Sequence, residues 1–279
     1  MGILYVVATP IGNLADITLR AIRVLRDVHL IAAEDTRRTH RLLVEHCIDT
    51  PVTSYHKYNK RTKLKYLLGC LDSSDIALVS DAGMPGLSDP GYELISSAVT
   101  KGNKVVPVPG PSAVMTAVVV SCLPFKQFIY VGFLPRRKGE RLRMLSGLAR
   151  ETRILVIFES PYRLMSSLRD IKDIMGNRRI AVCREMTKWY EEVFRGTVAE
   201  AMQHFDKPKG EITLVVEGIQ DSGKQPIDVN AAATQQVEQL HSQGMRLKDA
   251  AKEVASITGI SKRNLYQACS KITENNAES

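Results

Sequence analysis

The chain reads Ser80-Asp81-Ala82-Gly83-Met84-Pro85-Gly86-Leu87-Ser88-Asp89-Pro90-Gly91 immediately after the strand-like run Ile76–Val79. The three glycines and two prolines of this stretch end the strand and leave its backbone open to a cleft. Glycine lets a ligand approach the main chain closely, and an acidic side chain accepts hydrogen bonds from a ligand's hydroxyl or amino groups. The stretch therefore predicts a small-molecule site at the end of a strand.

Two more loops of this kind occur in the first half of the chain. Thr9–Asn13 follows the strand-like run Leu4–Ala8, and Pro107–Ala113 follows Lys104–Val106. Because the carboxyl ends of parallel strands meet at one edge of a sheet, the three loops predict one shared pocket. The alternative interpretation is that each loop is only a tight connection.

The composition indicates a soluble globular protein. With 279 residues, 44% of them hydrophobic and 24% charged, the chain can form two moderate domains and a small appendage. No apolar stretch approaches the about 20 residues of a membrane span, and the amino terminus enters a strand without a signal-peptide pattern. We therefore expect a cytoplasmic protein.

Cysteine and histidine patterns do not indicate a metal or a disulfide framework. The five cysteines are far apart and never form a Cys-x-x-Cys pair, and the six histidines show no ligand spacing. We expect reduced cysteines and no metal.

Strand and helix patterns alternate from the amino terminus. We expect a strand at residues 3–8, a helix at 17–26, a strand at 29–33 and a helix at 36–47, which is typical of an α/β domain with a mainly parallel sheet. A second unit contains strand-like runs at residues 128–133, 153–158, 179–183, 192–197 and 212–217. Since helices separate only the early runs, we expect a mixed sheet.

The last part of the chain differs from the rest. A polar linker, Gln220–Pro226, precedes a tail that is predicted to be helical from residue 229 to 272. Residues 247–255, 258–261 and 262–268 have the pattern of a helix-turn-helix, although many such small bundles only pack or dimerise. The predicted domains are residues 1–121, 122–220 and 221–279.

Basic residues are concentrated after the run 128–133. The formal net charge is +8, and residues 135–143 contain five basic side chains and one acid. Such a loop is suited to phosphate binding, while the alternative is a solvated helix start. The cations predicted to contact nucleic-acid phosphates, in this loop and elsewhere in the chain, are Arg136, Arg137, Lys138, Arg141, Arg184, Lys188, Lys262 and Arg263.

Several common chemistries lack their motifs. Gly-x-Gly-x-x-Gly, the Walker loop, Gly-x-Ser-x-Gly and a cysteine with a paired histidine are all absent from the sequence. Charged clusters instead follow predicted strands at Glu34–Arg38, Glu159–Arg163 and Arg184–Lys188. Mixed carboxylates and cations at a sheet edge suit proton handling and phosphate binding, although salt-bridged helix caps look similar.

Seven motifs together resemble the bacterial ribosomal RNA small-subunit methyltransferase I family, of the tetrapyrrole-methylase superfamily. They span nearly the whole chain in unbroken order: residues 4–14, 33–37, 79–91, 109–113, 132–136, 158–163 and 210–218. One departure concerns the first loop, which commonly reads Gly-x-Gly-Pro-Gly-Asp in the wider superfamily and here ends in Asn13. The amide argues against tetrapyrrole chemistry, while Asp81 of the second loop is retained.

The resemblance implies two α/β domains of the tetrapyrrole-methylase (class III methyltransferase) type, a small all-helical carboxyl-terminal domain and a homodimer. It implies S-adenosylmethionine-dependent methylation of the ribose 2′-hydroxyl of a decoding-centre cytidine in 16S ribosomal RNA, within the small ribosomal subunit. The cofactor-binding positions it implies are Pro10, Asp81, Ala82, Gly83, Met84, Ser112, Ala113, Phe158, Glu211 and Ile212. Glu159 is also expected to approach the cofactor.

A ribose hydroxyl is a weak nucleophile, so a group should accept its proton or stabilise the alkoxide. The proton-acceptor candidates are Glu34, Asp35 and Glu159, with Arg37 and Arg163 as groups that orient phosphate or stabilise charge. Two alternatives are methylation of a tetrapyrrole or a protein side chain, and a ligand-sensing, nucleic-acid-binding regulator without turnover.

Overall fold

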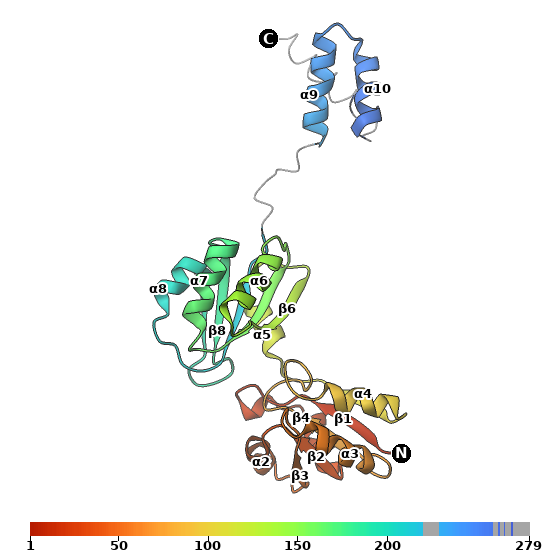
Figure 1. The fold of residues 1–279 in the computed structure, drawn as a ribbon, viewed down its shortest axis with the longest axis vertical. Helices are drawn as coiled ribbons and strands as arrows, with labels where there is room; N and C mark the ends of the chain where they lie inside the picture. Colours follow the sequence, from red (N-terminus) through yellow and green to blue (C-terminus); the bar gives the residue numbers. More distant parts are fainter. Residues whose placement is uncertain (220–228, 259–261, 263–264, 266–268, 270–279) are drawn as a thin grey trace. The chain divides into compact units, whose positions relative to one another are not determined.

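The computed structural model describes residues 1–219 and 229–258, together with residues 262, 265 and 269. The chain divides into two compact units, Met1–Ile219 and Gln220–Ser279. The first unit contains two five-stranded sheets, and the second contains helices (Figure 1). This architecture confirms the predicted fold class.

The first sheet is entirely parallel and has the strand order β3-β2-β4-β1-β5. Its strands are β1 (Ile3–Val7), β2 (Leu30–Ala33), β3 (Val52–Ser54), β4 (Ile76–Val79) and β5 (Lys104–Val108). Helices α1 (Leu19–Asp27) and α2 (Thr36–Glu45) pack on one face, and α3 (Lys60–Cys70) and α4 (Tyr92–Thr100) pack on the other. Every residue of β2 and β4 is buried, as expected for parallel strands covered on both faces.

The connections of this sheet create a crevice between β1 and β4. From β1 the chain crosses to β2 through α1, whereas from β4 it crosses to β5 through α4 on the opposite face. Adjacent parallel strands whose connections leave in opposite directions form a topological switch point, where ligands bind outside the carboxyl ends. The loop Thr9–Asn13 follows β1, and the loop Ser80–Gly91 follows β4.

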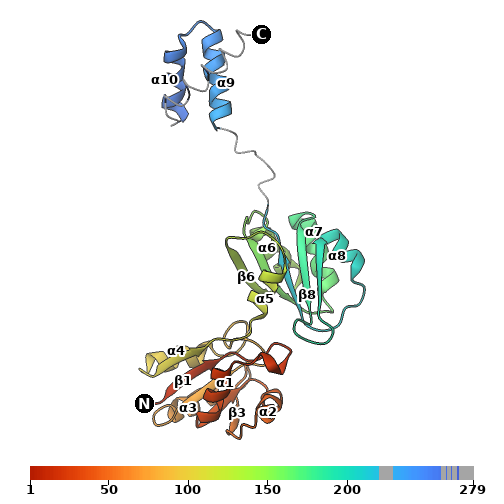
Figure 2. The same ribbon diagram turned by 180° about the vertical axis from the view of Figure 1, so that it is seen from behind.

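The second sheet has the order β6-β7-β10-β8-β9 and is mixed, as predicted, because only β6 and β7 pair in parallel. Its strands are β6 (Phe128–Phe133), β7 (Ile154–Glu159), β8 (Arg179–Arg184), β9 (Glu192–Thr197) and β10 (Ile212–Val216). Helices α6 (Lys138–Leu148), α7 (Leu164–Met175) and α8 (Val198–His204) cover one face, and α5 (Ala113–Val120) covers the other (Figure 2). Ile11, from the loop after β1, joins the α5 side of this core.

The second unit contains α9 (Val229–Ser242) and α10 (Leu247–Thr258). The tail is therefore not one continuous helix: Gly244 adopts a φ of 96° and its N–H donates to the carbonyl of His241, which ends α9. Ala233, Val237, Ala251 and Val254 are buried in a small core with Leu265 and Cys269. The linker 220–226 lies outside the described residues, as do residues 259–261 of the predicted turn 258–261, whereas Thr258 is the last residue of α10.

Among the described residues, none of the helices has both the length and the apolar composition that crossing a bilayer requires.

Candidate active site

Backbone hydrogen bonds join the two loops at the switch point. The N–H of Thr9 donates to the carbonyl of Gly83 over 2.9 Å, and the N–H of Gly83 donates back to Thr9 over the same distance. Gly83 has a φ of 74°, a conformation that a residue with a side chain rarely adopts. This bridge fixes the backbone two residues after Asp81, and Oγ1 of Thr9 donates to the carbonyl of Ser80, just before Asp81, over 3.1 Å.

Asp81 itself is oriented by the neighbouring strand end. Its Oδ1 accepts the N–H of Asp35 over 2.9 Å, and Nη1 of Arg38 lies 3.8 Å from its Oδ2. Asp81 is half-buried, so its carboxylate remains partly open to the crevice.

The loop after β1 also contacts the connection between β8 and β9. A Cβ on Gly12 would lie 2.5 Å from Cγ of Lys188, 2.7 Å from Oγ1 of Thr187 and 2.8 Å from the carbonyl oxygen of Met186. The N–H of Asn13 donates to Thr187 Oγ1 over 3.0 Å. Only glycine permits this approach, which brings the two sheets of the first unit to a common site.

Between the sheets lies a cavity of about 330 Å³, within the range of small-molecule sites. Its apolar wall includes Phe158, whose ring meets Phe133 and Tyr130 edge-on with centroids 5.5 and 5.3 Å away. Nine of the ten predicted cofactor residues line this cavity: Asp81, Ala82, Gly83, Met84, Ser112, Ala113, Phe158, Glu211 and Ile212. The tenth, Pro10, lies along a second hollow that adjoins it.

Asp89 also lines the cavity, although its sequence pattern alone does not mark it as a site residue. Burial and the nearby carboxylate of Glu34 raise the pKa of Asp89 to about 7. Burial, together with Asp81, also raises the pKa of Glu34, which lines neither the cavity nor the adjoining hollow. Asp89 lies in the loop 80–91, but what distinguishes it from other acidic residues is its proximity in space to the carboxylates of Glu34 and Asp81.

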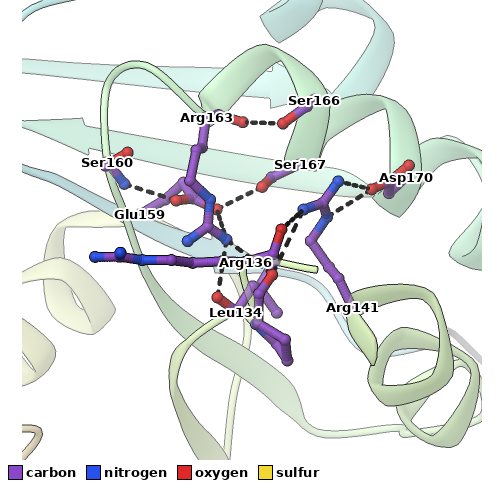
Figure 3. Close-up of polar contacts among 10 residues, drawn as sticks. Leu134, Arg136, Arg141, Glu159, Ser160, Arg163, Ser166, Ser167 and Asp170 are labelled. Atoms are coloured by element: carbon purple, nitrogen blue, oxygen red, sulfur yellow. Dashed lines mark hydrogen bonds and ion pairs between the residues drawn. The ribbon is translucent and has the colours of Figure 1, made fainter. Parts of the chain in front are cut away.

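Glu159 is held by an internal network (Figure 3). Its carboxylate accepts the N–H of Ser160 over 2.7 Å and the hydroxyl of Ser167, and it pairs with Arg163 at 3.4 Å. Arg163 also donates to the carbonyls of Leu134 and Pro135 over 2.8 and 3.2 Å. Glu159 borders the cavity, but its carboxylate is occupied by these contacts. It positions Arg163, which in turn holds the loop after β6.

Arg141 has a structural role that its position in a basic run does not reveal. It is 6% exposed, and its Nε donates to Oδ2 of Asp170 over 2.6 Å (Figure 3). Its Nη1 also donates to the carbonyl of Arg136 over 3.4 Å. The basic loop therefore has an inward-facing arginine, whereas Arg136, Arg137 and Lys138 are exposed.

The remaining candidates are spread over the molecule. Asp35 caps α2 and pairs with Arg37 at 2.7 Å, and the hydrogen bond from this guanidinium lowers the pKa of Asp35. Arg184 pairs with Glu192 at 2.7 Å, and Lys188 lies at the second hollow. Lys262 belongs to the second unit and Arg263 lies outside the described residues. Among the residues that the structure describes, no three histidine, cysteine, aspartate or glutamate side chains are arranged so that they could hold one metal ion.

Comparison with known proteins identifies the family. The Tetrapyrrole (Corrin/Porphyrin) Methylases family matches residues 3–202, and the RsmI C-terminal HTH domain matches residues 228–270. A Ribosomal RNA small subunit methyltransferase I of Halalkalibacterium halodurans is 47% identical over 95% of this chain and 93% of its own length. The chain belongs to this methyltransferase family. A member from Thermotoga maritima is 52% identical, over 78% of this chain and 99% of its own length.

Solved structures agree with this placement at the level of the fold. The X-ray structure of cobalt precorrin-4 methyltransferase superposes with a TM-score of 0.59 at 16% identity, over 77% of this chain and 94% of that one. Uroporphyrin-III-C-methyltransferase from Thermus thermophilus gives 0.57 at 17% identity, over 78% of this chain and 94% of that one.

The enzyme uses S-adenosylmethionine, as methyltransferases of this family do. The cavity fits such a ligand in its chemistry. Apolar side chains such as Phe158 and Ile212 suit the adenine, and carboxylates such as Asp81 suit the ribose hydroxyls and the positive charge of the cofactor. The edge-on aromatic cluster adds π-faces, which attract a cation.

Proposed function

We propose that this methyltransferase modifies the ribose 2′-hydroxyl of a decoding-centre cytidine in 16S ribosomal RNA, and that its substrate is the small ribosomal subunit in the cytoplasm. The observation that carries the proposal is the 47% identity to a Ribosomal RNA small subunit methyltransferase I along nearly the whole of both chains. Two of the seven motifs that carry the resemblance, residues 4–14 and 79–91, contain the loops at the switch point. A homodimer is part of the same proposal.

When bound, S-adenosylmethionine supplies an electrophilic methyl group, whose S–C bond breaks as an O–C bond to the ribose oxygen forms, leaving a neutral thioether. The chain has to align the ribose oxygen with the methyl group, since orientation alone removes much of the barrier. It also has to receive the hydroxyl proton. The rings of Phe133 and Phe158 form an apolar wall on one side of the cavity.

We assign the proton-accepting role to Asp89. It lines the cavity, and a pKa of about 7 lets it ionise and accept a proton near neutral pH. The earlier candidates are less suited: Asp35 is paired with Arg37, which lowers its pKa, and Glu159 already accepts from Ser160 and Ser167. Glu34 contributes by raising the pKa of Asp89.

Surface cations would then hold the RNA, chiefly through its backbone. We propose this role for Arg136, Arg137, Lys138, Arg184, Lys188, Lys262 and Arg263. Arg141 is left out because its guanidinium is buried against Asp170. Arg163 is likewise assigned to positioning the loop after β6, and Arg37 is bound to Asp35.

The test is transfer of labelled methyl from S-adenosylmethionine to small subunits purified from cells that lack the modification, followed by nuclease mapping. Label on the ribose of a single decoding-centre cytidine is the expected result. Label on a base, on a ribosomal protein or only on an added tetrapyrrole would refute the proposal. The two methyltransferases of tetrapyrrole chemistry compared above share only 16% and 17% identity with this chain, so their likeness supports the fold and not their substrate.

A further inference from the structure

A second hollow, of about 420 Å³, adjoins the cofactor cavity. The loop after β1, the outer face of α2 and the beginning of the loop after β4 form its walls in the first sheet's domain, and Lys188 and Glu211 complete it from the second sheet. The role assigned to the first cavity does not require this space.

The hollow contains cations from both sides. Arg38 and Arg41 lie three residues apart on α2 and so project from the same face, while Thr39 and Leu42 are buried in the core. Arg41 is exposed, and within the described part of the chain no hydrogen bond or ion pair engages its guanidinium.

Lys188 faces them from the connection between β8 and β9. Its Nζ is held 2.8 Å from Oε1 of Glu185 and 3.1 Å from Oε2 of Glu211, so the amine is fixed in place by the second sheet's domain. Arg38, 3.8 Å from Asp81, is the weakly paired cation of the opposite wall. The hollow thus combines the free guanidinium of Arg41, the weakly paired Arg38 and a lysine that two carboxylates hold in place.

Five residues line both the hollow and the cofactor cavity: Ile11, Arg38, Asp81, Ala82 and Glu211. The two spaces therefore lie side by side, and a ligand in the hollow is next to a ligand in the cavity. Asp81, which lines both spaces, can accept a hydrogen bond that orients a ribose hydroxyl at the junction, while Asp89, the proposed proton acceptor, lies on the cavity side.

We propose that the second hollow is the acceptor subsite: it binds one nucleotide of the RNA, with Arg41 and Arg38 on the phosphate and the ribose at Asp81. Guanidinium groups bind phosphate oxygens with paired, charge-assisted hydrogen bonds, and a carboxylate suits a sugar hydroxyl. This inference rests on the proposed function and adds the place where its substrate binds. It also explains why α2 presents two arginines to a crevice that already has acidic residues.

The test variant is Arg41→Met. The matched control is Arg20→Met, which removes the same charge from the exposed face of α1, away from both cavities. We expect Arg41→Met to raise KM for small subunits about 10- to 100-fold, with the Kd for S-adenosylmethionine, measured by calorimetry, changed less than about twofold. The dependence of log KM on log salt should weaken by about one unit. Arg20→Met should change KM less than about threefold.

Three results would overturn the inference. If Arg41→Met weakens S-adenosylmethionine binding as much as RNA binding, the hollow belongs to the cofactor. If both variants raise KM equally, only the overall charge matters. If cytidine 5′-monophosphate binds wild type and Arg41→Met equally tightly in the presence of saturating S-adenosylhomocysteine, the phosphate is not held by Arg41.

The nucleotide-binding measurement needs no turnover and separates this inference from the proposed function. Wild type that binds the nucleotide through Arg41 but labels no ribosomal RNA would refute the function and leave the subsite standing. Wild type that labels the cytidine while Arg41→Met behaves like Arg20→Met would refute only the subsite.

Discussion

The replacement Asp170→Asn tests whether buried ion pairs shape the basic loop. Arg141 and Asp170 have side chains that are each only 7% exposed, and both Nε and Nη2 of Arg141 lie within 2.6 Å of Oδ2 of Asp170. An asparagine removes the negative charge and leaves the buried guanidinium without a counter-ion, although its hydrogen bond to the carbonyl of Arg136 remains. Breaking such a pair from one side costs about 3–5 kcal/mol, so the free energy of unfolding should fall by that amount.

The matched control is Asp173→Asn, on the exposed face of the same helix, which should change the free energy of unfolding by less than about 0.5 kcal/mol. Urea denaturation monitored by circular dichroism gives both values from the shift in midpoint. The double replacement Arg141→Met with Asp170→Leu removes the charge along with its partner, so it should recover most of the loss. Equal, small effects of Asp170→Asn and Asp173→Asn would refute the reasoning.

The same variant reports on the loop itself. Because Arg141 donates to the carbonyl of Arg136, losing the pair frees the backbone that carries Arg136 and Arg137. Trypsin should then cleave after these exposed arginines faster in Asp170→Asn than in wild type under native conditions. Unchanged cleavage in a destabilised variant would show that Arg163 alone holds the loop.

Four further predictions concern the contact between the sheets, the carboxylates, the tail and the exposed tryptophan. Gly12→Ala should destabilise the protein by about 1–3 kcal/mol, because the added methyl group meets the Met186–Lys188 segment. The control Gly147→Ala, on an open face of α6, should stabilise the protein by about 0.5–1 kcal/mol. Urea denaturation measures both changes. Because the pKa of Asp89 is raised, its ionisation disfavours the folded state, and the free energy of unfolding without ligand should fall between pH 3.8 and about 7. Affinity for the cationic cofactor should rise through about pH 7 as the carboxylate forms. Asp89→Asn should remove both dependences, as measured by denaturation and calorimetry at a series of pH values. A chain ending at Ile219 should bind S-adenosylmethionine with the wild-type Kd, since the Thermotoga maritima relative aligns over 99% of its own length with only 78% of this chain. A loss of binding would show that the tail supports the site. Trp189 is the only tryptophan and is 93% exposed beside Lys188, so small-subunit RNA should quench its fluorescence by stacking a base on the ring. Heparin, a polyanion without aromatic bases, should leave the fluorescence unchanged.

The strand ends and their loops could be predicted from the sequence because their signals are local. Apolar runs followed by glycine and proline placed β1, β4 and β5 to within a residue or two, and parallel strands send such loops to one edge. The role of Gly12 could not be read in this way. Its φ is not left-handed, and the reason for glycine is the side chain of Lys188, 176 positions later in the chain.

Charged residues were harder to place, because a charge in a sequence does not state its partner. Arg137 and Arg141 belong to the same basic run, yet Arg137 is exposed while Arg141 meets Asp170, 29 residues away. Glu159 suggested proton transfer because it ends a strand, but Ser167 and Arg163 on the next helix use its oxygens. Only the three-dimensional partners distinguish a structural carboxylate from a reactive one.

The two domains of the first unit contribute different chemistry to the site, and this difference explains how one fold accommodates different acceptors. The first supplies fixed backbone and carboxylates, through the Thr9–Gly83 bridge and Asp81, whereas the second supplies the aromatic wall around Phe158. The exposed face of α2 at Arg41 lies outside this frame, because Arg41 does not line the cofactor cavity. Substrate choice in such a fold is therefore expected to depend on surface cations such as Arg41, which a change in acceptor would alter while leaving the cofactor cavity intact.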